Sequence, residues 1–132
     1  KQKKLLNKYV FLKKNIKYNK MIKIYKNSDV FTLPATKEPG SISVLESMSF
    51  GLPVIVSNNC GTRCYVKKNY TGRIFKDNNL KSLVNEIEFF LKNSQQIRIY
   101  RGRSIRLFKK IHTTDIFLEN FTHLTKRMFD SY

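Results

Sequence analysis

The sequence predicts an α/β fold built around a doubly wound parallel sheet. Short apolar, β-prone runs alternate with segments in which apolar residues recur at helical spacing. The strands expected from these runs lie at 9–12, 29–33, 53–56 and 72–75. Because helices connect successive strands, we expect the strands to pair in parallel through right-handed crossovers. Sheets of this kind bind ligands beyond the carboxyl ends of their strands.

Each element has local signals for where it begins and ends. Lysines bound the first strand on both sides, and a short helix is expected at 20–26. The second strand ends at Pro34, which fixes its own backbone and holds the preceding residue extended. A helix then runs from Ser43 to Gly51. Three further helices are expected from the spacing of their apolar residues, which are Leu80, Leu83, Val84, Ile87 and Leu91, then Ile97, Ile105, Phe108 and Ile111, and finally Phe117, Phe121, Leu124 and Met128.

The length of 132 residues is that of one ordinary domain with one core. The sequence has no internal repeat and no flexible linker that would divide it. It also has no run approaching the roughly 18 consecutive apolar residues that a membrane-spanning helix needs. The first residue is Lys1 and not methionine, and we therefore expect the chain to be a piece of a longer protein.

The charge balance is strongly basic, with 26 Lys and Arg residues against 9 Asp and Glu and a formal net charge of +17. Such a charge favours contact with nucleic acid or with an anionic membrane surface. Two basic runs, at 1–26 and 98–110, carry most of this signal. A general bias of the sequence toward Lys, Asn, Ile, Tyr and Phe would produce the same runs as solvated faces. A basic binding module is therefore kept as the alternative class of function.

Metal and redox chemistry have little support in the residues. The two cysteines, Cys60 and Cys64, have only His112 and His123 as distant imidazoles. This set is too sparse for a four-ligand zinc site, and reduced thiols are expected. No loop carries a DxD-like pair of acids that would hold a divalent ion. We expect neither a metal nor another cofactor.

The candidate site is the loop from Pro34 to Ser43, which lies beyond the second strand and leads into the next helix. A helix N-terminus presents unpaired N–H groups and a partial positive charge, which suit a phosphate or a diphosphate. Two carboxylates bracket it, Glu38 in the loop and Glu46 inside the helix. A carboxylate can accept two charge-assisted hydrogen bonds from a vicinal diol of a sugar. A nucleotide-sugar carries this combination of groups, because its diphosphate lies between the hydroxyls of the sugar and those of the ribose.

A purely structural interpretation of Glu46 competes with this one. Ser43 and Glu46 also form an S-x-x-E capping box, in which the Glu46 side chain accepts a hydrogen bond from the Ser43 N–H. The motif by itself leaves both interpretations open.

The stretch IYKNSDVFTLPATKEPGSISVLESMSFGLPVIVSN, at 24–58, resembles the signature region of the GT4-type retaining glycosyltransferases of the GT-B fold. Glu38 and Glu46 stand at the spacing of that family's E-x7-E motif. The resemblance extends upstream to 9–12 and downstream to 70–75, where YTGRIF is similar to the family's "ntGxlf" segment.

This resemblance implies a Rossmann-like doubly wound sheet in the C-terminal half of a GT-B fold. Residues 1–132 would then be one partial nucleotide-sugar-binding domain, with the N-terminal acceptor domain and two further βα units absent from the sequence. Those units carry a Gly-Arg turn and a basic residue that neutralises the diphosphate, so the isolated chain is expected to be inactive. A non-catalytic remnant with an exposed apolar sheet edge is a third interpretation.

The resemblance also implies sugar transfer with retention, without a metal, from a UDP- or GDP-sugar to a glycan or lipid-linked acceptor. Glu38 would be the catalytic residue and contact hydroxyls of the donor sugar, and Glu46 would bind the ribose hydroxyls. The implied donor-binding segment also includes Gly40, Ser41, Ile42, Ser43 and Val44, with the amides around the last three facing the diphosphate. Ser41 departs from the family, because many members have glycine there.

Location and partners follow from the same resemblance. A role in surface polysaccharide or glycoconjugate biosynthesis would place the protein in the cytoplasm, peripheral on the inner face of the membrane. An anionic membrane surface is then an expected partner. No specific nucleic acid is expected.

Overall fold

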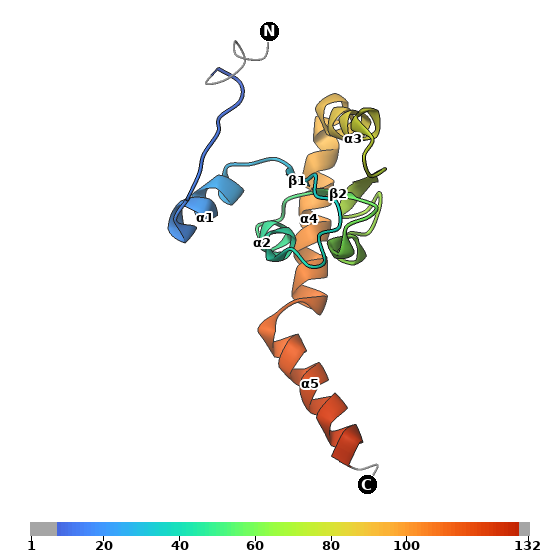
Figure 1. Ribbon diagram of the computed structural model, residues 1–132. Helices are drawn as coiled ribbons and strands as arrows, with labels where there is room; N and C mark the ends of the chain where they lie inside the picture. Colours follow the sequence, from blue (N-terminus) through green and yellow to red (C-terminus); the bar gives the residue numbers. More distant parts are fainter. Residues whose placement is uncertain (1–7, 130–132) are drawn as a thin grey trace.

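The computed structural model describes residues 8–129, and Figure 1 shows how their elements are arranged. In chain order these are α1 (Tyr18–Lys26), β1 (Phe31–Leu33), α2 (Ile42–Ser49), β2 (Val54–Ser57), the short 3₁₀ helix η2 (Gly61–Tyr65), β3 (Gly72–Phe75), α3 (Leu80–Lys92), α4 (Ser94–Ile111) and α5 (Thr114–Phe129).

The three strands form one parallel sheet in the order β1-β2-β3. Phe31 pairs with Val54 at the start of β1, and Val54 pairs in turn with Gly72 at the start of β3. The glycine is required there, because a Cβ at position 72 would lie 2.1 Å from the Val54 carbonyl oxygen. The predicted parallel pairing is therefore confirmed.

The central strand β2 is buried on both faces of the sheet. Val54 and Val56 pack with Val44 and Met48 of α2 on one face. Ile55 points to the other face, where it packs with two aromatic residues, Phe90 of α3 and Tyr100 of α4. The C-terminal half of α4 contributes Leu107 to the cluster on the first face. Helix α4 therefore contributes residues to the clusters on both faces of the sheet. Helices on both faces of a parallel sheet confirm the predicted α/β, doubly wound fold class.

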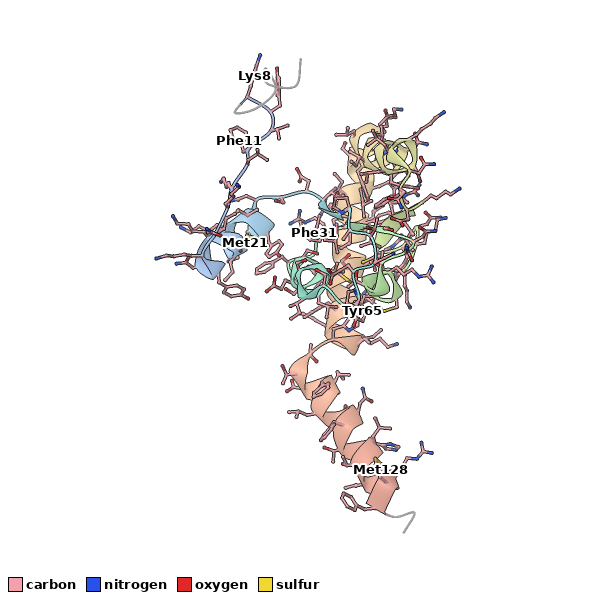
Figure 2. All side chains as sticks on the ribbon, viewed as in Figure 1. Lys8, Phe11, Met21, Phe31, Tyr65 and Met128 are labelled. Carbon is pink, nitrogen blue, oxygen red and sulfur yellow. The ribbon has the colours of Figure 1, made fainter. Side chains whose placement is uncertain are left out.

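One predicted strand is wrong. Residues 9–12 form no strand of this sheet, and Tyr9, Val10, Phe11 and Leu12 are exposed. The segment runs away from the sheet, and Phe11 lies far from Phe31 in Figure 2. A strand needs a hydrogen-bonding neighbour, and none of the described residues provides one beside β1. Among residues 8–129, no strand pairs with the outer edge of β1.

The C-terminal helix α5 projects beyond the packed body (Figure 1). The sequence correctly predicts its helical periodicity, but none of its residues is buried. Its exposed apolar side chains include those of Phe117, Phe121, Leu124 and Met128. Among the helices of residues 8–129, none has the length and apolar character to cross a bilayer.

Candidate functional site

Two loops meet at the carboxyl edge of the sheet. Residues 34–41 connect β1 to α2, and residues 58–60 follow β2. The N–H of Gly61 donates to the carbonyl oxygen of Glu38 at 2.8 Å, and the N–H of Lys37 donates to that of Asn59 at 3.3 Å. A Cβ on Gly61 would lie 2.1 Å from the Pro39 carbonyl oxygen, so only glycine allows this approach. The two loops are therefore held together as one unit.

The side chain of Glu38 lies in this unit and is half-buried. Its Oε1 accepts a hydrogen bond from the N–H of Gly40 at 3.3 Å. Within the described part of the chain, the Glu38 carboxylate has no other hydrogen bond and no ion pair. A carboxylate has about four lone-pair sites, so most of its acceptor capacity is left for a ligand.

The N-terminus of α2 lies directly after Gly40. Ser41 is the N-cap residue but makes no side-chain capping bond, and its hydroxyl instead lies 2.6 Å from that of Ser43. The amides of Ile42 and Ser43 find no acceptor among residues 8–129. The N–H of Val44 donates to the Ser41 carbonyl oxygen at 3.2 Å, so a ligand at Val44 would compete with that bond. Open amides at a helix N-terminus suit an anion.

The capping-box interpretation of Glu46 is wrong. The helix begins two residues earlier than that motif requires, with Ser41 as N-cap and Ser43 inside the first turn. The Glu46 carboxylate does not contact the Ser43 amide but accepts a hydrogen bond from the hydroxyl of Tyr25, at 3.1 Å from Oε2. The side chain of Glu46 is thus directed toward α1.

Tyr25 is a residue that the sequence reasoning did not place in the site. It is 3% exposed, and its ring stacks on that of Phe50 with a centroid distance of 5.5 Å. Burial, followed by the hydrogen bond and the negative charge of Glu46, raises the pKa of Tyr25 to about 12. The phenol is therefore protonated at neutral pH and is the donor in this pair. Tyr25 lies inside the stretch at 24–58 on which the family resemblance rests, and this was the available signal.

Hydrogen bonds of Asp77 connect two further loops at the same edge of the sheet. The Asp77 carboxylate accepts hydrogen bonds from Ser57 Oγ at 3.3 Å and from Asn59 Nδ2 at 3.1 Å. The Asp77 N–H donates to Asn58 Oδ1 at 2.7 Å. These bonds tie the loop after β3 to the loop after β2, which contacts the Glu38 segment. The polar run after the fourth predicted strand was the signal for this group.

The predicted site residues therefore form one segment. Glu38, Gly40 and Ser41 lie in the loop, and Ile42, Ser43 and Val44 form the first turn of α2. Glu46 lies further along the same helix, on the side that contacts α1. No cluster of three or more His, Cys, Asp or Glu side chains able to hold a metal occurs in the part of the chain that the structure describes.

The arrangement of the chain is that of an α/β domain with a helix N-terminus and an uncompensated carboxylate at the carboxyl edge of a parallel sheet. The same fold occurs in sucrose-phosphate synthase from Thermosynechococcus elongatus, with a TM-score of 0.85 and 21% identity over 99% of this chain and 33% of that one. The sequence matches the family described as "Glycosyl transferases group 1" over residues 1–105. The chain belongs to this family.

Two curated relatives are similar to just over half of the chain. UDP-Gal:alpha-D-GlcNAc-diphosphoundecaprenol alpha-1,3-galactosyltransferase of Escherichia coli is 41% identical over 69 residues, which are 52% of this chain and 18% of that protein. N,N'-diacetylbacillosaminyl-diphospho-undecaprenol alpha-1,3-N-acetylgalactosaminyltransferase of Campylobacter jejuni is 31% identical over 75 residues, or 57% of this chain and 20% of that protein. The chain thus spans 18% to 20% of the length of these relatives.

Proposed function

We propose that the protein containing this chain transfers a sugar, with retention, from a UDP- or GDP-sugar to a glycan or lipid-linked acceptor. The chain supplies part of the donor site. The observation that carries this proposal is the juxtaposition of the Glu38 carboxylate with the open amides of Ile42 and Ser43, in the segment with the E-x7-E spacing. Membership of the family supports the reaction class.

In this proposal the departing nucleoside diphosphate lies at the N-terminus of α2. The helix dipole and the amides of Ile42 and Ser43 stabilise the negative charge that develops on the diphosphate as the glycosidic bond breaks. Glu38 is the catalytic residue: its carboxylate holds hydroxyls of the donor sugar and stabilises positive charge on the reacting ring. Gly40 and Ser41 line the sugar between these two groups. Further cationic groups for the diphosphate would come from other parts of the protein.

Glu46 is proposed to bind the ribose. A carboxylate accepts hydrogen bonds from both hydroxyls of a vicinal diol, and charged acceptors make stronger hydrogen bonds than neutral ones. The half-burial of Glu46 favours this role, because a partly desolvated charge gains more from a polar ligand than a fully hydrated one.

The acceptor is proposed to be a polyprenyl-diphosphate-linked sugar. Both curated relatives carry such an acceptor in their names. The net charge of +17 fits a protein that contacts an anionic membrane surface. We place this contact on the cytoplasmic face of the membrane and the reaction in the assembly of a surface glycan. Co-sedimentation with vesicles of anionic lipid that falls as salt rises would support the membrane contact, and equal binding to neutral vesicles would contradict it.

The test compares three Glu-to-Gln variants of the whole gene product. UDP-galactose and undecaprenyl-diphosphate-linked GlcNAc serve as the first substrates, because the E. coli relative is named for that pair. Glu38→Gln is expected to lower kcat by about a hundredfold or more, since it weakens charge stabilisation in the transition state. Glu46→Gln is expected to weaken UDP or GDP binding by about tenfold or more in calorimetric titration.

Glu119→Gln is the matched control. Glu119 lies on the exposed helix α5, outside the residues that match the family, and should change neither quantity. Full activity of the Glu38→Gln variant would refute the catalytic assignment. Unchanged nucleotide affinity in the Glu46→Gln variant would remove Glu46 from the site.

A further inference from the structure

The side chain of Glu46 is held by one contact. The hydroxyl of Tyr25 donates to Oε2 at 3.1 Å across 21 positions of sequence. Among residues 8–129, no other group donates to this carboxylate and no cation pairs with it. A glutamate side chain has several rotamers on a helix surface, and restricting them costs conformational entropy. Tyr25 is therefore the contact that selects one orientation of Glu46.

The hydroxyl of Tyr25 is itself fixed by packing. Its ring lies 5.5 Å from the ring of Phe50, nearly parallel at 17°, and 6.1 Å from that of Phe31. Phe50 is the C-cap residue of α2 and Phe31 is the first residue of β1. The Arg101 side chain also donates to the Ser28 carbonyl oxygen at 3.0 Å, which holds the connection between α1 and β1 against α4. The tyrosine is thus built into the same framework as the site.

A neutral donor suits this position. A lysine or arginine beside Glu46 would offset its charge, whereas a phenol fixes the carboxylate without bringing a compensating charge. Burial and the neighbouring charge raise the pKa of Tyr25 to about 12, so the donor keeps its proton through the neutral range. Tyr25 occupies one of about four lone-pair sites of the carboxylate, and the remaining sites can accept ribose hydroxyls.

We propose that Tyr25 is a positioning residue for nucleotide recognition, which orients the Glu46 carboxylate toward the ribose hydroxyls of the bound donor. This inference rests on the proposed function of Glu46. It adds a residue from α1 to a site otherwise formed by the loop at 34–41 and helix α2.

The test is Tyr25→Phe in the whole gene product, which removes the hydroxyl and keeps the ring stacked on Phe50. Affinities for UDP and GDP, each beside its 2′-deoxy analogue, are measured by calorimetric titration. We expect the ribonucleotide that binds to lose about three- to tenfold in affinity, the equivalent of one hydrogen bond. The deoxy analogue should lose less, so that the preference for ribose over deoxyribose falls. A general disturbance of the fold would weaken both ligands equally and leave that preference unchanged.

Tyr100→Phe is the matched control. Tyr100 is also 3% exposed and packed among aromatic rings, but its hydroxyl makes no hydrogen bond to the described residues. This variant should keep both affinities. In a background of Glu46→Gln, the Tyr25→Phe change should have a much smaller effect, because the group through which Tyr25 acts has lost its charge.

The outcomes separate this inference from the function on which it rests. If Glu46→Gln weakens nucleotide binding but Tyr25→Phe does not, or weakens ribo and deoxy forms equally, Tyr25 is a structural residue only and the inference is overturned. If Glu46→Gln itself has no effect, the proposed role of Glu46 fails, and the inference fails with it.

Discussion

Helices α2 and α5 have the same kind of sequence pattern and opposite surroundings. Both carry apolar residues at helical spacing, but α2 has 8 residues and buries Val44, Ser47 and Met48, whereas α5 has 16 residues and buries none. The first packs against the sheet and α4, and the second extends past the end of the body (Figure 1). Helical periodicity therefore shows which face of a helix is apolar but does not show whether another element covers it.

The segment at 9–12 shows that the same holds for a β-prone run. Its residues are as β-prone as those of β2, yet β2 is buried on both sides and this segment is exposed. In Figure 2, Phe11 and Met128 lie at opposite ends of the molecule, away from Phe31 and Tyr65 in the packed body. The central region contains the candidate site, and the terminal regions carry exposed apolar side chains.

The largest effect that can test this comparison is the loss of a core side chain. Met48→Ala should lower the free energy of unfolding by about 2–5 kcal/mol, because Met48 is fully buried and its removal leaves a cavity. Leu124→Ala, on the exposed face of α5, should cost about 0.5 kcal/mol or less. Chemical denaturation of the purified chain measures both. A comparable loss for Leu124→Ala would show that α5 packs against something in solution.

A smaller effect is expected at the contact between the two site loops. Gly61→Ala forces a Cβ to within 2.1 Å of the Pro39 carbonyl oxygen, and the Glu38 loop must then move. We expect a loss of about 1–3 kcal/mol, read from thermal melts, together with weaker nucleotide binding.

Gly102→Ala is the control for this change. A Cβ at position 102 meets no atom within 4 Å, and the residue lies inside α4. Alanine should stabilise this helix by about 0.5–1 kcal/mol and leave ligand binding unchanged. An equal and mild effect of both substitutions would mean that the loops are not held together as described.

The smallest effect concerns the pH dependence of stability. The pKa of Tyr25 is raised from 10.0 to about 12 in the folded chain, so the folded state retains this proton more strongly than the unfolded state. Its contribution to stability is fully present below pH 10.0 and is lost as the pH rises toward 12. We expect a loss on the order of 1 to 2 kcal/mol in this range, measured by urea denaturation at several pH values. The Tyr25→Phe variant should lack this component, and an identical alkaline profile for both proteins would contradict the raised pKa.

The site could be predicted in part because its residues are close in sequence. Glu38, Ser41 and Ser43 lie within one loop and one helical turn, so the order of strand, loop and helix was enough to place them at the carboxyl edge of the sheet. The contact of Tyr25 with Glu46 could not be predicted, because it joins residues 21 positions apart and depends on how α1 packs on α2. The failure of the capping-box interpretation could not be predicted for the same reason, because the Glu46 carboxylate contacts Tyr25 and not the Ser43 amide.

The sequence by itself determined the class of fold, the parallel pairing of its strands and the position of the Glu38 segment. These follow from local patterns: β-prone apolar runs, prolines and glycines at element ends, and the connection of strands through helices. Only the tertiary structure decided which apolar faces are covered, where the N-cap of α2 lies and what Glu46 contacts. Burial and long-range hydrogen bonds depend on which elements are neighbours in space, and the period of a single segment carries no information about its neighbour.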